Sequence, residues 1–456
     1  MASLVAVGRF GFLQRNWGCL IMAAALLSVL SLLISVALLQ LANGLYLTFI
    51  SVRMDLEQFS ELAIGAIGSA YFGGFIIGAL YCDRFIQKVG HIRAYIGFGA
   101  LTCAVVMSHS WLIDPVYWGL LRFIAGVVSS GLFMVVESWL NERSDRNNRG
   151  SIFAAYLVIN YLALGGGQFL LNVSDPAGPM LFLLIGTLFA LSLTPIALGE
   201  ATVPAAYERR SFNVRELFDV SPLGVVGVLV IGLANGAFYS LAPIFAARLG
   251  FDTAGIGEFM AAAILSGLIM QWPLGKMSDL FDRRTILIIV AVLTCAVAAG
   301  IAAVTFNPEA DHRIILILIC AYGSALYALY PLAVAHANDH VEPADTVPLA
   351  AGLLLAYGVG ALFGPFLASA VMGLMGTPGL FTFIAGVAGA LAIFGLFRMR
   401  MSKPVPMDDQ GTFMPLPRTS PVLVAEMHAM TDFEDAEFEN NADEEPESEA
   451  HSVTKG

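Results

Sequence analysis

Two charged residues interrupt one of the longest apolar runs of this chain and are the first candidates for chemistry. Arg122 and Glu137 lie 15 residues apart, which is about 22 Å along a helix, so they cannot pair directly. Arg122 is expected to bind an anionic group or to keep a carboxylate ionised. The alternative is a side chain that links helices and extends its head group outward. Glu137 is predicted to meet Lys88 or Arg93 from a nearby loop.

Amide and phenol side chains form a second set of candidates. Asn43 and Asn235 occupy equivalent places in two apolar runs, with Gln40 three residues before the first and Tyr239 four residues after the second. At these spacings each pair shares a helix face. The four side chains could hydrogen-bond a polar solute, or they could hold helices together; both readings stay open. Weaker candidates of the same kind are Asn160, Gln168, Tyr327, Tyr330 and Tyr357.

A third set lies in one loop, Gly275-Lys276-Met277-Ser278-Asp279-Leu280-Phe281-Asp282-Arg283-Arg284. Gly275 is expected to let two helices approach closely. Asp279 is expected to cap the next helix and to pair with Arg283 and Arg284. Such a contact would act as a latch, and the alternative is a cluster of positive charges that only anchors the loop.

Metal chemistry and catalysis are not expected. His336 and His340 share a helix face at a spacing that can chelate zinc, but no glutamate follows the first histidine. A helix end or gate is the preferred reading there, and no cofactor is predicted. Because acids, Ser/His pairs and metal ligands do not converge at one depth, an enzyme acting on lipid ranks far below the other functions.

The elements that position these residues follow from composition. The chain has 456 residues, 58% hydrophobic and 13% charged, with a mean hydropathy of +0.77. Since soluble domains are about a quarter charged, the sequence predicts an all-α membrane protein. Runs of about 20 apolar residues can cross a bilayer. Twelve lie near residues 24–50, 61–82, 93–112, 116–140, 149–172, 179–199, 222–248, 253–275, 284–306, 313–337, 348–374 and 378–398.

Basic residues predict the orientation of these spans. With both termini in the cytoplasm, the cytoplasmic segments hold Arg9, Arg15, Arg84, Lys88, Arg93, Arg143, Arg146, Arg149, Arg209, Arg210, Arg215, Lys276, Arg283, Arg284, Arg398, Arg400 and Lys403. The opposite side holds only Arg53, Arg248 and Arg313. We therefore expect a multi-pass protein of a bacterial plasma (inner) membrane.

An internal repeat divides the chain. Leu41-Ala42-Asn43-Gly44 recurs as Leu233-Ala234-Asn235-Gly236, and Gly167-Gln168-Phe169-Leu170 corresponds to Gly364-Pro365-Phe366-Leu367. The sequence thus predicts a six-helix half over 1–199, a cytoplasmic loop over 200–220, a second half over 221–400 and a tail over 401–456. Two parallel halves with a binding site between them are a transporter architecture.

Several motifs resemble those of the major facilitator superfamily. The loop from Gly275 to Arg284 is similar to the family's G-x-x-x-D-R-x-G-R-R loop. In the first half only Lys88, Gly90 and Arg93 fit that pattern, since Asp83 and Gln87 replace its glycine and aspartate. Five further segments resemble the YcaD-like branch of bacterial facilitators. They are Arg122-Phe123-Ile124-Ala125-Gly126, Val135-Val136-Glu137-Ser138-Trp139, Asn148-Arg149-Gly150, Gln271-Trp272-Pro273-Leu274-Gly275 and Leu329-Tyr330-Pro331-Leu332-Ala333.

The resemblance implies a fold of twelve helices, a cavity lined by Arg122 and the amides, and transport of a small solute by alternating access. It does not identify the solute, the direction or a coupling proton. A monomer without a nucleic-acid partner is expected. The alternative function is a transporter-fold sensor that signals through the acidic tail, which is expected to be disordered or to dock through Phe433 and Phe438.

Overall fold

The structure is a computed structural model that describes residues 29–144, 149–198, 214–307, 310–342, 345–401, 405–406, 410–411 and 413. The described residues that have regular secondary structure are helical, and twelve of the helices are long and apolar enough to cross a membrane. This agrees with the all-α membrane fold predicted from the composition.

Two sets of helices follow each other along the chain. The first set is α2 (Leu30–Leu56), α3 (Glu61–Val89), α4 (His91–Ser108), α5 (Pro115–Glu142), α6 (Arg149–Phe169) with a 3-10 turn η1 (Leu170–Val173), and α7 (Met180–Ala197). A short helix α8 (Val214–Val220) precedes the second set, α9 (Pro222–Arg248), α10 (Thr253–Leu280), α11 (Arg283–Thr305), α12 (His312–Asn338), α13 (Thr346–Met375) and α14 (Gly379–Met401).

The first predicted span is the one placed least accurately. Its predicted range of 24–50 lies six residues before the helix at 30–56. The apolar run gives no signal at its start, whereas the helix ends where the charged residues Arg53, Asp55 and Glu57 gather. Residues 24–28 lie outside the described part of the chain.

Local sequence signals set the starts of several helices. Ser60, Asp114 and Asp252 each accept a hydrogen bond from a backbone N–H in the first turn of α3, α5 and α10, as capping residues do. Gly90 separates α3 from α4 with a φ of 88°, a conformation that favours glycine. These signals keep the turns between spans short.

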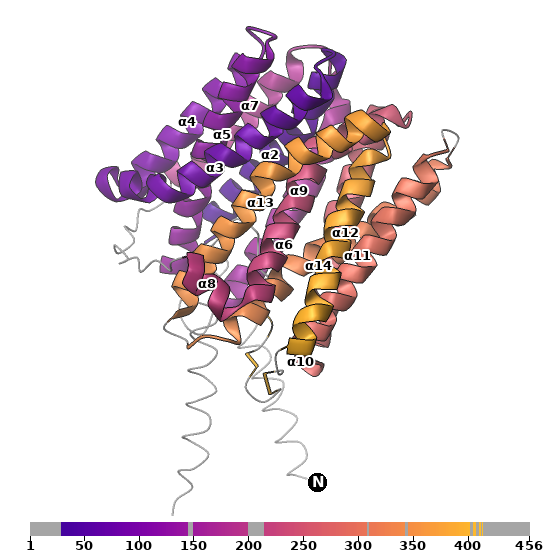
Figure 1. Cartoon of the computed structure of the whole chain (residues 1–456). Coiled ribbons are helices and arrows are strands. Elements are labelled where there is room, and N and C mark those ends of the chain that lie inside the picture. The colour runs from indigo at the N-terminus through magenta and orange to yellow at the C-terminus, as the bar shows by residue number, and fades with distance from the viewer. Residues whose placement is uncertain are drawn as a thin grey trace, which may run out of the picture.

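Successive spans alternate in direction, so the bundle has two ends. The Arg248 end contains the ends of α2 and α9 and the starts of α3 and α10. The Arg283 end contains the end of α10, the start of α11 and α8, which lies at the bottom of Figure 1. In the same view α2 to α5 and α7 gather on one side, and α11, α12 and α14 on the other.

The repeated motifs pack in equivalent ways in the two halves. A Cβ atom added to Gly167 on α6 would lie 2.3 Å from the carbonyl oxygen of Leu41 on α2. A Cβ atom added to Gly364 on α13 would lie 2.2 Å from the carbonyl oxygen of Leu233 on α9. Glycine therefore permits backbone contact at corresponding points, as is common between membrane helices. The two motif pairs found in the sequence are partners in space.

The halves meet closely at the Arg248 end. Arg248 pairs with Asp55 at 3.0 Å and with Glu61 at 2.6 Å, which links α9 to α2 and α3. A Cβ atom on Gly65 of α3 would lie 2.7 Å from the carbonyl oxygen of Pro365 on α13. One apolar core continues across both halves here, whereas buried residues from α8 to α14 form a separate core toward the Arg283 end.

The glycine contacts predict a matched pair of variants. Gly364→Ala should lower the melting temperature by several degrees, because overpacking costs about 1–3 kcal/mol. Gly386→Ala should leave it unchanged, since no other group lies within 4 Å of its added Cβ. Thermal unfolding of the purified protein in detergent measures both. If Gly364→Ala and Gly386→Ala melted at the same temperature, the contact between α9 and α13 would not be tight.

Candidate functional site

The guanidinium of Arg122 is enclosed within the bundle. The residue is 4% exposed, and its Cζ lies 4.9 Å from the ring centre of Tyr46 and 4.3 Å from that of Tyr71. Both rings contribute cation–π attraction, which is strongest away from water. Nη1 makes no hydrogen bond to any described residue. The side chain therefore does not extend to the surface, and one of its donors is available.

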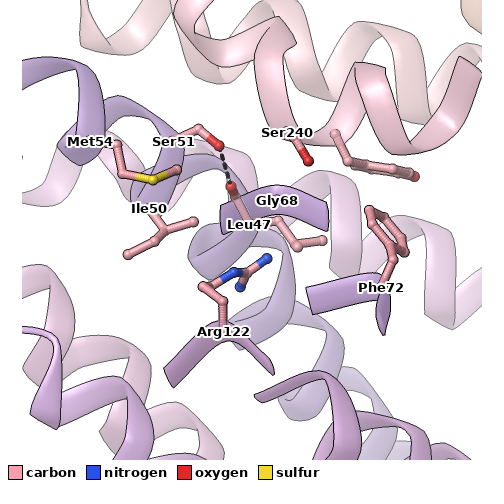
Figure 2. A pocket seen from close by; sticks show the side chains of 9 residues that line it. Leu47, Ile50, Ser51, Met54, Gly68, Phe72, Arg122 and Ser240 are labelled. Atoms are coloured by element: carbon pink, nitrogen blue, oxygen red, sulfur yellow. Dashed lines mark hydrogen bonds between the residues drawn. The ribbon is translucent and has the colours of Figure 1, made fainter. Parts of the chain in front are cut away.

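A small pocket lies beside Arg122 and is lined by both halves (Figure 2). Its walls are Leu47, Ile50, Ser51, Met54, Gly68, Phe72 and Arg122 from the first half and Tyr239 and Ser240 from the second. The guanidinium points toward the space between α2, α3 and α9. The empty space among these residues is about 280 Å³, which includes the part that is open to solvent.

The amides of the first half form a network between α2 and α6. Gln40 is buried and donates to Asn160 Oδ1 at 2.6 Å, while it accepts from Asn43 at 3.3 Å. Further along the same interface, Thr48 donates to Gln168, whose Nε2 donates to the carbonyl oxygens of Gly44 and Leu164. Three of the four amides, Gln40, Asn160 and Gln168, thus join α2 to α6. The fourth, Asn43, remains partly exposed.

The second half contributes tyrosine hydroxyls, and one of its glutamines forms a hydrogen bond to the first half. Tyr239 on α9 lies 2.5 Å from the hydroxyl of Tyr327 on α12. Gln271 on α10 donates to the hydroxyl of Tyr161 on α6 at 2.7 Å. Asn235 is fully buried on α9 and lies outside the set that lines the pocket. Of the four predicted amides and phenols, only Tyr239 lines the pocket with Arg122.

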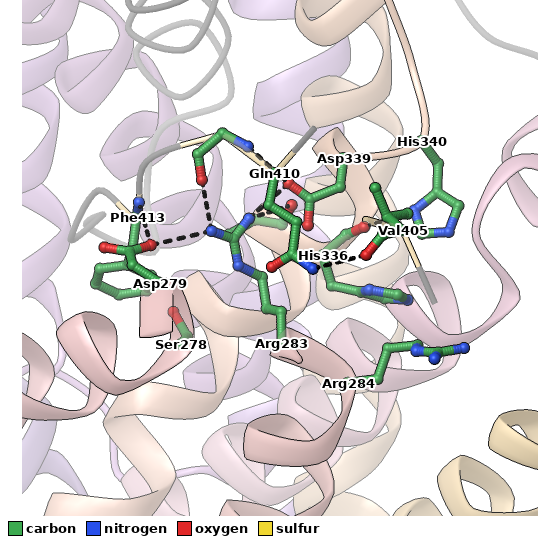
Figure 3. Close-up of polar contacts among 12 residues, drawn as sticks. Ser278, Asp279, Arg283, Arg284, His336, Asp339, His340, Val405, Gln410 and Phe413 are labelled. Atoms are coloured by element: carbon green, nitrogen blue, oxygen red, sulfur yellow. Dashed lines mark hydrogen bonds and ion pairs between the residues drawn. The ribbon is translucent and has the colours of Figure 1, made fainter. Parts of the chain in front are cut away.

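A second polar cluster lies at the Arg283 end (Figure 3). Arg283, 1% exposed at its side chain, donates to Asp279 at 3.1 Å and to Asp339 at 2.6 Å. Asp279 closes α10 and Asp339 follows α12, so one guanidinium joins three helices. Removing one partner of an ion pair this deeply buried is costly, because the other charge is left buried and unpaired. His336 and His340 lie next to this cluster, with ring centres 4.8 Å apart.

The predicted cap of α11 was assigned to the wrong aspartate. Asp279 lies within the last turn of α10 and points to Arg283, whereas Asp282 occupies the N-cap and accepts from the Arg284 N–H at 3.0 Å. Asp282 also pairs with the side chain of Arg284 at 2.9 Å. α10 continues five residues past its predicted end at 275, because no Gly or Pro follows Gly275 to stop it.

The corresponding residues of the first half lie at the same end. Lys88 and Arg93 are exposed on either side of Gly90, and Glu137 is buried at 3% exposure on α5. Gln87 donates to Asp83 at 3.1 Å, one helical turn earlier. The predicted pairing of Glu137 with a loop cation stays a prediction. Among the described residues no group of three or more His, Cys, Asp or Glu side chains could hold a metal ion.

Comparison with known proteins gives the family. The family model described as Major Facilitator Superfamily matches residues 17–307 and 224–423. The chain belongs to the major facilitator superfamily. It is 29% identical over 79% of its length to the uncharacterised MFS-type transporter YcaD of Salmonella newport (strain SL254), covering 93% of that protein. An uncharacterised MFS-type transporter of Yersinia enterocolitica is 30% identical with the same coverage.

Solved structures show the same facilitator fold. A mutant of the nucleoside transporter NupG superposes with a TM-score of 0.70 at 12% identity, over 81% of this chain and 99% of that one. A D-xylose–proton symporter gives 0.63 at 14% identity, over 83% and 98%. These identities are too low to carry over a substrate. The fold predicted from the repeat and the resemblance to the YcaD-like branch are both confirmed.

Four residues of these two clusters escaped the reasoning from sequence. Tyr46 and Tyr71 hold Arg122, but single tyrosines in apolar runs carry no pattern. Asp339 follows the end of α12, where a single acidic residue carries no pattern either. Phe413 packs on the Arg283 cluster, whereas the predicted anchors Phe433 and Phe438 lie outside the described residues.

Burial and charge act differently on two carboxylates of this facilitator. Burial raises the pKa of Asp339 to about 6 although Arg283 opposes the shift. Burial also disfavours ionisation of Asp282, but hydrogen bonds and charge from Arg284 together outweigh it and lower the pKa. Asp339 therefore titrates near neutral pH, and Asp282 stays ionised there.

The pKa of Asp339 predicts a pH dependence of stability. Because about 6 lies above the ordinary value of 3.8, the folded chain binds this proton more tightly than the unfolded chain. Lowering the pH from 7 to 5 should therefore raise the free energy of unfolding. This gain is lost when the pH rises through 6. Asp339→Asn should lack this contribution. Melting temperatures of both proteins across this range measure the difference in slope, and equal slopes would contradict the assignment.

Proposed function

We propose that the chain moves a small polar solute across a bacterial inner membrane by alternating access, with the solute held between the halves beside Arg122. The observation that carries this proposal is that Arg122 lines a pocket formed by both halves while its buried Nη1 donor has no partner among the described residues. A polar group buried without a partner is costly. A solute that accepts a hydrogen bond from Nη1 would remove this cost.

The charges near the pocket favour an anionic or neutral solute. The nine residues that line it include one cation and no carboxylate. An ionisable residue within a span commonly marks a substrate path. A carboxylate or phosphate group would find one formal charge and the hydroxyls of Ser51, Tyr239 and Ser240. An organic cation would meet the same charge as repulsion.

The division into halves gives the moving parts. Residues 1–199 and 221–400 would rock against each other around the pocket, joined by 200–220, with both termini in the cytoplasm. The Arg248 end would then face the periplasm, and the ion pairs of Arg248 together with the continuous core support a state closed on that side. The Arg283 end would form the cytoplasmic mouth, with Gly275, Asp279, Arg283 and Arg284 opposite Lys88, Gly90, Arg93 and Glu137.

A coupling proton would need a group that changes its surroundings between the two states. Among the described residues, Glu137 and Asp339 are buried carboxylates near the proposed mouth. Neither contacts the pocket, so coupling would act through the mouth and not through the solute site. The exchange of the proton would then follow opening and closing of that end.

Arg122 provides the central test. A thermal-shift screen of carboxylates, phosphates and neutral metabolites identifies a ligand, since binding to the native state raises the melting temperature. Arg122→Ala should abolish both this shift and the flux of the ligand into proteoliposomes. Arg122→Lys should restore little, because an ammonium does not reproduce a planar group held between two rings. Arg313→Ala, at an exposed residue, is the control. Full flux in Arg122→Ala protein would refute the proposal.

The ion pairs of Arg248 test the closed state. Arg248→Ala removes both ion pairs between α9 and the first half, so opening toward the periplasm should become easier. A cysteine at Ser51, 2% exposed in this state, should then react faster with an impermeant maleimide added outside cells. Arg53→Ala serves as control, because the contacts of Arg53 with Glu57 and with the Pro176 carbonyl oxygen stay within the first half. Unchanged labelling would mean that these pairs do not hold the periplasmic side closed.

A further inference from the structure

A segment of the C-terminal tail is bound at the Arg283 end. Arg283 Nη2 donates to the carbonyl oxygen of Gly411 at 2.6 Å, and the Gly411 N–H donates to Asp339 at 3.3 Å. The Phe413 N–H donates to Asp279 at 2.8 Å. The tail segment thus uses the same three charged side chains that join α10, α11 and α12 (Figure 3).

The side chain of Phe413 anchors this segment. It is 9% exposed and belongs to the apolar core of the second half. A Cβ atom added to Gly275 would lie 2.1 Å from its ring, so only glycine at this position leaves room for it. Backbone hydrogen bonds and one buried aromatic ring are the usual means of holding an extended peptide. Gln410 Nε2 also donates to the Val405 carbonyl oxygen at 3.0 Å.

We propose that Gly275, Asp279, Arg283 and Asp339 form a peptide-binding site for the part of the tail that contains Gly411 and Phe413, with Phe413 as the anchor. The bound segment covers the surface that Gly275 would offer to a neighbouring helix. It also occupies Asp279, the acid of the latch. The segment therefore has to leave before this surface can close the cytoplasmic mouth, and the tail acts as an intramolecular brake. The braking step rests on the proposed function, whereas the binding site does not.

The binding site is tested on the full chain without its native cysteines. A nitroxide on Gln410→Cys should give an immobilised spectrum. Phe413→Ala should make it mobile, and Gly275→Ala should do the same from the opposite side of the contact. Phe438→Ala, which changes a tail phenylalanine outside the described residues, should have no effect. A mobile label in the parent protein, or an immobile one in both Phe413→Ala and Gly275→Ala, would overturn the site.

The braking step has its own measurement. Release of the segment should favour the state that is open to the periplasm, so maleimide labelling of Ser51→Cys should rise about threefold or more in Phe413→Ala protein. Phe438→Ala should label like the parent. A released segment with unchanged labelling would overturn the brake while leaving the binding site. If Arg248→Ala does not change the maleimide labelling of Ser51→Cys, that result contradicts the proposed closed state of the transport cycle. The nitroxide spectra, which test the binding site, do not depend on it.

Discussion

Close contact between helix backbones is the constraint on which this structure depends. Lipid is as apolar as leucine, so burying apolar side chains gives membrane helices little reason to associate. Association then relies on dispersion and on polar contacts, both of which require short distances. Gly167 and Gly364 supply these distances at corresponding points, where α6 meets α2 and α13 meets α9. The amide of Gln168, next to Gly167, adds hydrogen bonds that the bilayer cannot replace.

This constraint explains why the amides and Arg122 have different roles. Gln40 and Gln168 lie at close helix contacts, and their hydrogen bonds are satisfied there. Arg122 lies where three helices leave space, and its charge is stabilised by the faces of Tyr46 and Tyr71. Aromatic faces stabilise the cation without using its N–H donors. The site can therefore keep a permanent charge and still offer a hydrogen bond to a solute.

Much of the fold was predictable because its signals are local or periodic. Eleven of the twelve spans begin within about two residues of the predicted position, and the repeated Asn-Gly pairs do pack alike in both halves. The site was predicted only in part. Arg122 is conspicuous because charge in a span is rare, but its tyrosines come from two other helices at no fixed spacing. The role of Asp282 was missed because a D-x-x-D loop offers two possible caps, and only the end of α10 decides between them.

The Arg283 end shows how one set of charges can serve two partners. Asp279 and Asp339 each accept from Arg283 and also from the backbone of the tail. A carboxylate has two oxygens with about four lone-pair positions, so it can hold a second donor without releasing the first. The ion pairs that hold α10, α11 and α12 together can therefore persist when the tail leaves. What changes is the access to Gly275, which Phe413 covers. A contact of this kind can be gained and lost during a transport cycle without loosening the half that carries it.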